Sequence, residues 1–240
     1  MCSLCEQRHY GVVACALGWA CWKTYLGRPE TDWSLTTAMG QLGNGLYRAN
    51  QATEALSVQK ALLSLHRRLG SPIGNFLPLQ SNMASTYTEL GRLDEAISLR
   101  RDVYSERLRL YGEEHEDTLL AALNYADTLC KLRHFAEPKL LLNRTIPVAL
   151  RVLGAEDSLT LKMRWAYARA LYMDPAVTLD DLREAVTSLE ELVRTTRRVF
   201  GNTHPFTRDL ERNLEGAREF LRRGPEALRG AVATHRPCGS

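Results

Sequence analysis

Cysteine and histidine are the residue types of this chain with the clearest capacity for chemistry, and several lie close to its start. Cys2, Cys5, His9 and Cys15 fall within the first 15 residues, and thiolate and imidazole groups are the usual ligands of tetrahedral zinc. Their spacing does not match a closed four-ligand site. We therefore expect a cysteine-bearing terminus that holds no metal, and we expect no cofactor.

Two further histidines and one cysteine are candidates for reactive groups. His115 and His204 occupy equivalent positions near expected helix starts, which favours roles in turns or helix caps over a role as a catalytic base. Cys130 is either a reactive thiol or, more commonly for a cysteine in this setting, a small packed hydrophobe. The sequence contains no nucleophile elbow, phosphate-binding loop, dinucleotide fingerprint or His-Glu-x-x-His motif. We predict that the chain is not an enzyme.

Composition fits a folded protein whose partners are not nucleic acids. Of its 240 residues 45% are hydrophobic and 25% are charged, and the formal net charge is only +3, which is too balanced to indicate nucleic-acid binding. Between Cys21 and Cys238 the only cysteine is Cys130. A secreted disulfide scaffold distributes its cysteines through the fold, so we predict a reducing compartment and a cytoplasmic location.

The apolar segment Gly11–Trp22 allows two interpretations. It has the length of a signal-peptide core, but a convincing small-residue cleavage site is missing, and it is too short to cross a bilayer. We prefer the second interpretation, a helix that precedes a repeat array, and expect no association with membranes.

A period of about 42 residues organises the chain. Glycines that follow a large apolar residue are separated by 43, 42, 42 and 47 residues, and Glu-Ala or Glu-Pro pairs keep nearly the same step. One five-residue insertion around Asp174–Asp181 explains the longest interval. The glycines are Gly27, Gly70, Gly112, Gly154 and Gly201.

Within each period the apolar residues recur at helical intervals and are interrupted by a tight turn, which predicts two amphipathic helices per unit. Neither helix of such a pair can bury its apolar side alone, so successive pairs are expected to stack in chain order. The basic segments Leu99–Arg101 and Arg194–Arg198 fall on the second helices, where we expect a solvated surface.

One unit carries a recognisable motif. Asn82, Ala84, Tyr87, Gly91 and the pair Glu95–Ala96 have the spacing of the core tetratricopeptide signature, and the chain resembles that family over about Thr31–Arg223. The usual repeat has about 34 residues. The longer period here, together with Gly201-Asn-Thr-His-Pro-Phe-Thr207, resembles the kinesin light chain branch.

The resemblance implies an all-α fold, a right-handed solenoid of stacked antiparallel helix pairs. It implies three regions: an N-terminal helix or half-repeat over 1–30, four repeats and a capping helix over 31–223, and a disordered tail over 224–240. First helices would line a concave groove that holds a peptide of a partner protein. Its predicted lining residues are Asn82, Ser85, Asn124, Asp127, Lys131, Lys162, Trp165, Arg169, Tyr172, Arg212 and Asn213.

The side chains of this predicted groove suggest an acidic peptide with an apolar anchor, because its C-terminal half combines aromatic and basic residues. The asparagines and Trp165 of the predicted groove each allow a second interpretation. The asparagines either bind a peptide backbone or bridge neighbouring helices, and Trp165 either binds a guest or fills the core.

Three functional classes remain from the sequence. An adaptor that binds other proteins is the leading hypothesis. The second is a fragment of a larger signalling protein whose catalytic or nucleotide-binding domain lies outside these residues. A helical-repeat RNA binder is the third, and its affinity would depend strongly on salt. The partner and the oligomeric state are not indicated by the sequence.

Overall fold

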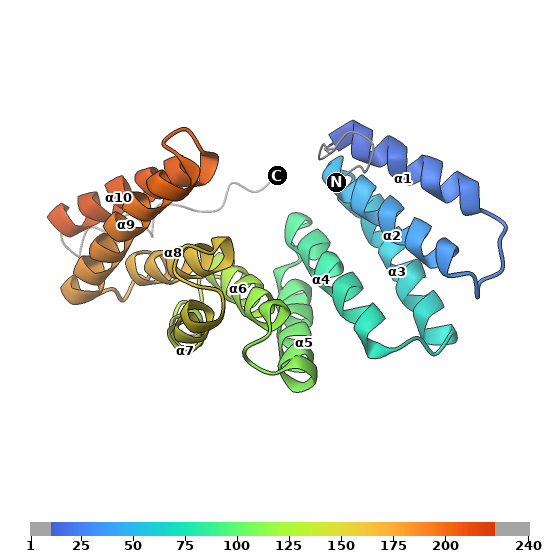
Figure 1. Cartoon of the computed structure of the whole chain (residues 1–240), viewed down its shortest axis with the longest axis horizontal. Helices are drawn as coiled ribbons and strands as arrows, with labels where there is room; N and C mark the ends of the chain where they lie inside the picture. The colour runs from blue at the N-terminus through green and yellow to red at the C-terminus, as the bar shows by residue number, and fades with distance from the viewer. Residues whose placement is uncertain (1–10, 224–240) are drawn as a thin grey trace. The chain divides into compact units, whose positions relative to one another are not determined.

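The computed structural model describes residues 11–223, and every regular element in this range is an α-helix (Figure 1). The predicted all-α repeat fold is confirmed. Three members of the predicted metal-free N-terminal group, Cys2, Cys5 and His9, lie outside the described residues, as do Cys238 and the predicted tail. The ten helices of the described range are α1 (Gly11–Tyr25), α2 (Trp33–Arg48), α3 (Ala52–Arg68), α4 (Ile73–Glu89), α5 (Leu93–Tyr111), α6 (Glu116–Lys131), α7 (Ala136–Val152), α8 (Ser158–Tyr172), α9 (Leu179–Phe200) and α10 (Pro205–Arg223).

Short polar side chains start several of these helices by accepting hydrogen bonds from otherwise unpaired backbone N–H groups. Asp157 accepts from Leu159 N at 2.8 Å at the start of α8. Thr178 and Asp181 form a reciprocal capping box at the start of α9. Each cap pairs N–H groups that the first turn leaves free and so fixes the residue at which its helix begins.

The two repeat-related histidines serve the same purpose, as predicted. His115 Nδ1 accepts from Asp117 N at 3.1 Å, and His204 Nδ1 accepts from Phe206 N at 3.2 Å. Each imidazole also stacks on the last aromatic ring of the preceding helix, on Tyr111 or on Phe200. The histidines therefore join the end of one repeat to the start of the next.

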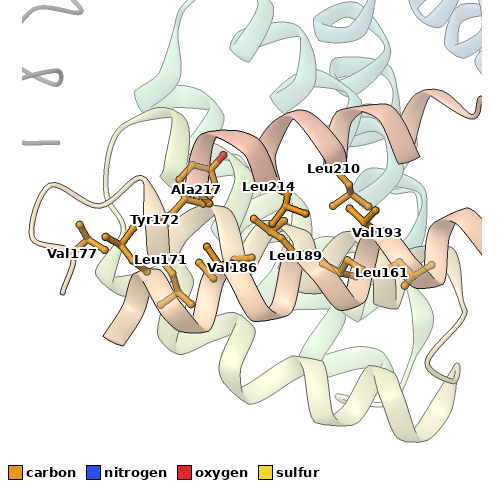
Figure 2. Packing of buried hydrophobic residues seen from close by; sticks show 14 residues of the cluster. Leu161, Leu171, Tyr172, Val177, Val186, Leu189, Val193, Leu210, Leu214 and Ala217 are labelled. Atoms are coloured by element: carbon orange, nitrogen blue, oxygen red, sulfur yellow. The ribbon is translucent and has the colours of Figure 1, made fainter. Parts of the chain in front are cut away.

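Apolar clusters join consecutive helices, and the helices divide into two compact units that meet within α5, between Glu106 and Arg107. In the first unit, one cluster joins α1, α2 and α3, and another joins α3, α4 and α5. In the second unit, one cluster joins α6, α7 and α8, and the largest joins α8, α9 and α10 (Figure 2). Every cluster thus spans helices from two adjacent pairs.

Small residues permit the close approach of helices at one repeating position. Ala84, Ala126 and Ala168 are completely buried. At the corresponding Gly43 an added Cβ would lie 3.3 Å from Gln59 Cγ, closer than most such contacts. A larger side chain at this position would push the second helix away from the first.

A substitution in the apolar cluster of α8, α9 and α10 measures how much the stacking of helix pairs contributes to the free energy of unfolding. Leu189 of α9 has no exposed surface and lies beside Val186 and Leu214 (Figure 2). We expect Leu189→Ala to lower the free energy of unfolding by about 3 kcal/mol, through lost burial and the cavity that remains. The control Leu140→Ala, at a side chain that is 74% exposed, should change it by less than about 0.5 kcal/mol. Urea denaturation followed by circular dichroism measures both, and equal effects would contradict this packing.

Candidate functional site

Three first helices of the second unit, α6, α8 and α10, bring most of the predicted groove residues together. Within this unit α6 contacts α8, and α8 contacts α10. Nine of the eleven predicted residues lie on these helices, while Asn82 and Ser85 lie on α4 of the first unit. The second-unit residues therefore form the candidate site, which we call the first-helix face.

An ion pair connects α6 to α8 across this face. Arg169 Nη2 donates to Asp127 Oδ1 at 2.6 Å, although the two residues are 42 positions apart in the chain. The Arg169 guanidinium also lies over the ring of Trp165, 5.3 Å from its centroid. Both side chains of the ion pair are only partly exposed, so solvent screens their attraction less than on an open surface.

Trp165 itself belongs to the contact between α8 and α10. Its ring packs edge-on against Phe206 with 5.6 Å between centroids, and it lies against the α8–α10 apolar cluster. One side of this ring therefore contributes to the core while the Arg169 guanidinium covers another. The two interpretations of Trp165, core packing and contact with a guest, are therefore compatible.

A second polar contact joins α8 to α10. The Tyr172 hydroxyl donates to Asn213 Oδ1 at 2.5 Å, and Asn213 Nδ2 donates to the Asp209 carbonyl at 2.7 Å. Burial raises the pKa of Tyr172 to about 12, so the phenol remains a hydrogen-bond donor at neutral pH. This contact holds the end of α8 against the middle of α10.

The remaining basic residues of the first-helix face are exposed. Lys131 and Lys162 lie at the surface of α6 and α8, and Asn124 is half-buried on α6. Arg212 lines a hollow of about 560 Å³ along α10 and forms an ion pair with Asp209 one turn earlier. The face therefore presents four basic side chains beside two carboxylates, those of Asp127 and Asp209.

On α4 of the first unit the predicted groove residues contact neighbouring helices. Asn82 Nδ2 donates to Asn44 Oδ1 of α2 at 2.9 Å. Ser85 accepts a hydrogen bond from Arg100 Nη2 at 2.7 Å. At Asn82, as at Asn213, the asparagine bridges two first helices, as one of the two interpretations proposed.

The expectation that Leu99–Arg101 is solvated was wrong for Arg100. Its side chain is buried, with 7% of its surface exposed, and its guanidinium donates to the hydroxyls of Ser81 and Ser85. These two serines lie one turn apart on the same side of α4. Their spacing in the sequence was the signal that a polar side chain of α5 would pack against them. Buried Arg100 holds the helices of one pair together.

Cys130 of α6 behaves as a packed residue. It is largely buried, and this burial raises the pKa of its thiol to about 11. The reactive form of cysteine is the thiolate, so this site lacks the environment of an activated nucleophile.

The described residues offer neither a cluster of metal ligands nor a membrane-spanning helix. Between Gly11 and Arg223 no group of three or more His, Cys, Asp or Glu side chains is placed to hold a metal ion. Cys15, the one member of the N-terminal Cys/His group in this range, has its Sγ 3.7 Å from Gln51 Oε1. None of the helices in the same range has the length and apolarity needed to cross a membrane.

The geometry defines a helical-repeat protein, and comparison with known proteins identifies the repeat. Tetratricopeptide repeat family models match residues 76–150 and 177–206. Both stretches are therefore tetratricopeptide repeats, and the fold of the chain is similar to that of kinesin light chain-like repeat proteins. Such repeats are typically non-catalytic and mediate contacts between proteins. A comparison with curated protein sequences finds no match.

Solved structures support the same fold. BtubC (BKLC) from P. vanneervenii is 14% identical, with a TM-score of 0.57 over 95% of this chain and 92% of that one. A putative kinesin light chain with nearly identical TPR-like repeats from Podosopora anserina is 19% identical. Its TM-score is 0.59 over 83% of this chain and 97% of that one, and a second crystal structure, of a variant of that protein, gives 0.60 with 96% of that chain covered.

Alkylation tests the assignment of Cys130 as a packed residue. Because its thiol pKa is raised from about 9 to about 11, the thiolate fraction near pH 8 should be roughly a hundredfold lower than in an unperturbed thiol. We expect iodoacetamide to modify Cys130 at least that much more slowly in the folded chain than in urea, as measured by mass spectrometry. Equal rates in the two states would refute the assignment.

Proposed function

We propose that this chain is a non-catalytic adaptor that binds a peptide segment of a partner protein on its first-helix face. The observation that carries the proposal is the Asp127–Arg169 ion pair, one repeat apart, with Arg169 held over Trp165. Side chains fixed in this way lose little conformational entropy when a partner binds, and preorganisation of this kind increases affinity.

The chemistry of the face supports a partner that is acidic and carries an apolar anchor. Lys162, Trp165 and Arg169 follow one another at intervals of three and four residues on α8, so they share one side of that helix. Lys131 extends the basic surface on α6. Aromatic and arginine side chains at the centre of an interface are the residue types that contribute most to binding.

The ion pair also constrains where an acidic residue would bind. Asp127 already compensates the charge of Arg169, and Asp209 already compensates that of Arg212. The exposed Lys131 and Lys162 are therefore the proposed contacts of the peptide carboxylates. Arg169 and Trp165 together form the proposed contact of its apolar anchor. We assign the adaptor to the cytoplasm on the distribution of cysteines in the sequence.

Charge reversal at the two lysines tests the proposed partner. We expect Lys131→Glu/Lys162→Glu to weaken binding of an acidic peptide with one central aromatic residue by about tenfold or more, because each reversal replaces attraction with repulsion. Fluorescence anisotropy with peptides selected from an acidic library measures the dissociation constants at two salt concentrations.

The matched control places the same charge change on another surface of the same unit. Arg183 and Arg194 are exposed on the second helix α9, so Arg183→Glu/Arg194→Glu should leave the affinity nearly unchanged. Equal losses in both double variants would show only non-specific attraction. No change in the lysine variant would refute the proposed site.

A further inference from the structure

α1 is an apolar helix that is docked by one side against α2. Ala14 and Gly18 are buried in this contact. A Cβ atom at Gly45 of α2 would lie 2.6 Å from the Ala14 carbonyl oxygen, and one at Gly18 would lie 3.0 Å from the Gln41 carbonyl oxygen. The two backbones are therefore in direct contact, and this contact determines which side of α1 faces away from α2.

The outward side of α1 is apolar over most of its length. Val12 is 81% exposed, Val13 and Leu17 are each 51% exposed, and Trp19 is 44% exposed. Lys23, in the last turn, is its first charged residue. We call this surface the α1 face, which consists of Val12, Val13, Ala16, Leu17, Trp19 and Ala20.

Other helices that face solvent carry charge on the corresponding side. The exposed residues of α3 include Glu54, Lys60 and Arg67. Those of α10, the last helix of the described range, include Arg208 and Glu215. A polar outer surface of this kind is what keeps the end of a helical repeat array soluble. α10 has such a surface and α1 does not, so the α1 face is suited to contact a partner.

The charge and the size of the α1 face favour one partner. The α1 face is neutral, so a neutral apolar surface complements it, and a second copy of α1 supplies such a surface. The charged outer side of α10 does not, which argues against end-to-end stacking of copies. A 15-residue helix is about 22 Å long, and two such faces bury on the order of 1,000 Å² together, near the lower limit for a specific interface.

We propose that the chain forms a two-fold symmetric dimer in which α1 packs antiparallel against α1 of a second copy. A two-fold axis brings the same residues of both copies together. Ala16 and Ala20 are small enough to let the helices approach, with Val13 and Leu17 on one side of the contact and Val12 and Trp19 on the other. The antiparallel arrangement places the two Lys23 ammonium groups at opposite ends, whereas a parallel one would place them together.

The test compares two alanines that are both exposed on helices of the first unit, Ala16 on α1 and Ala61 on α3. Sedimentation velocity of the full chain between about 1 and 100 µM should show a monomer–dimer equilibrium, because an interface of this size gives modest affinity. Ala16→Arg should be monomeric across this range, and Ala61→Arg should dimerise like the wild type. Circular dichroism melting checks that each variant is folded.

The double variant Val13→Ser/Leu17→Ser removes apolar surface without adding charge, so it should also be monomeric. If Ala16→Arg fails to fold, the oligomeric state of this double variant tests the proposed dimer instead. A monomeric wild type would overturn the proposal. So would an Ala16→Arg variant that is folded and still dimeric. Flotation of the wild type with neutral phosphatidylcholine vesicles, when it is monomeric in solution, would assign the α1 face to lipid and would also overturn it.

Discussion

The structure depends on one constraint: a single pair of these helices cannot cover its own apolar surface. Each apolar cluster combines side chains of at least two adjacent pairs, as in the one that joins α8, α9 and α10. Burial of apolar area is the dominant favourable contribution to folding, and here much of that area lies between pairs. A pair is therefore ordered mainly by its neighbours.

The same constraint positions the candidate site. Stacking sets the first helices α6, α8 and α10 beside one another within the second unit. Residues one repeat apart in the sequence then become neighbours in space. Asp127 and Arg169 are 42 positions apart, and Tyr172 and Asn213 are 41 apart. A polar surface of this type is a consequence of the repeat length and requires no additional loop or domain.

The fold could be predicted from the sequence because its signals repeat. The glycines at 42-residue steps, among them Gly112 and Gly154, end second helices with positive φ angles, and His115 and His204 cap the following first helices. The site was less predictable. Helical spacing placed Trp165 and Arg169 on one side of α8, but it gave no information on Asp127 as the partner of Arg169, because that contact depends on the distance between helices. Arg100 was misassigned because a single buried arginine does not alter the periodicity of its helix.

An isolated helix pair tests most directly whether a pair is ordered by its neighbours. A peptide that comprises residues 116–152, the pair α6 and α7, should be largely unfolded by circular dichroism in water, while the full chain is helical and unfolds cooperatively. A peptide with the helicity of the full chain and its own cooperative thermal transition would contradict the account, because the pair would then need no neighbour to cover it.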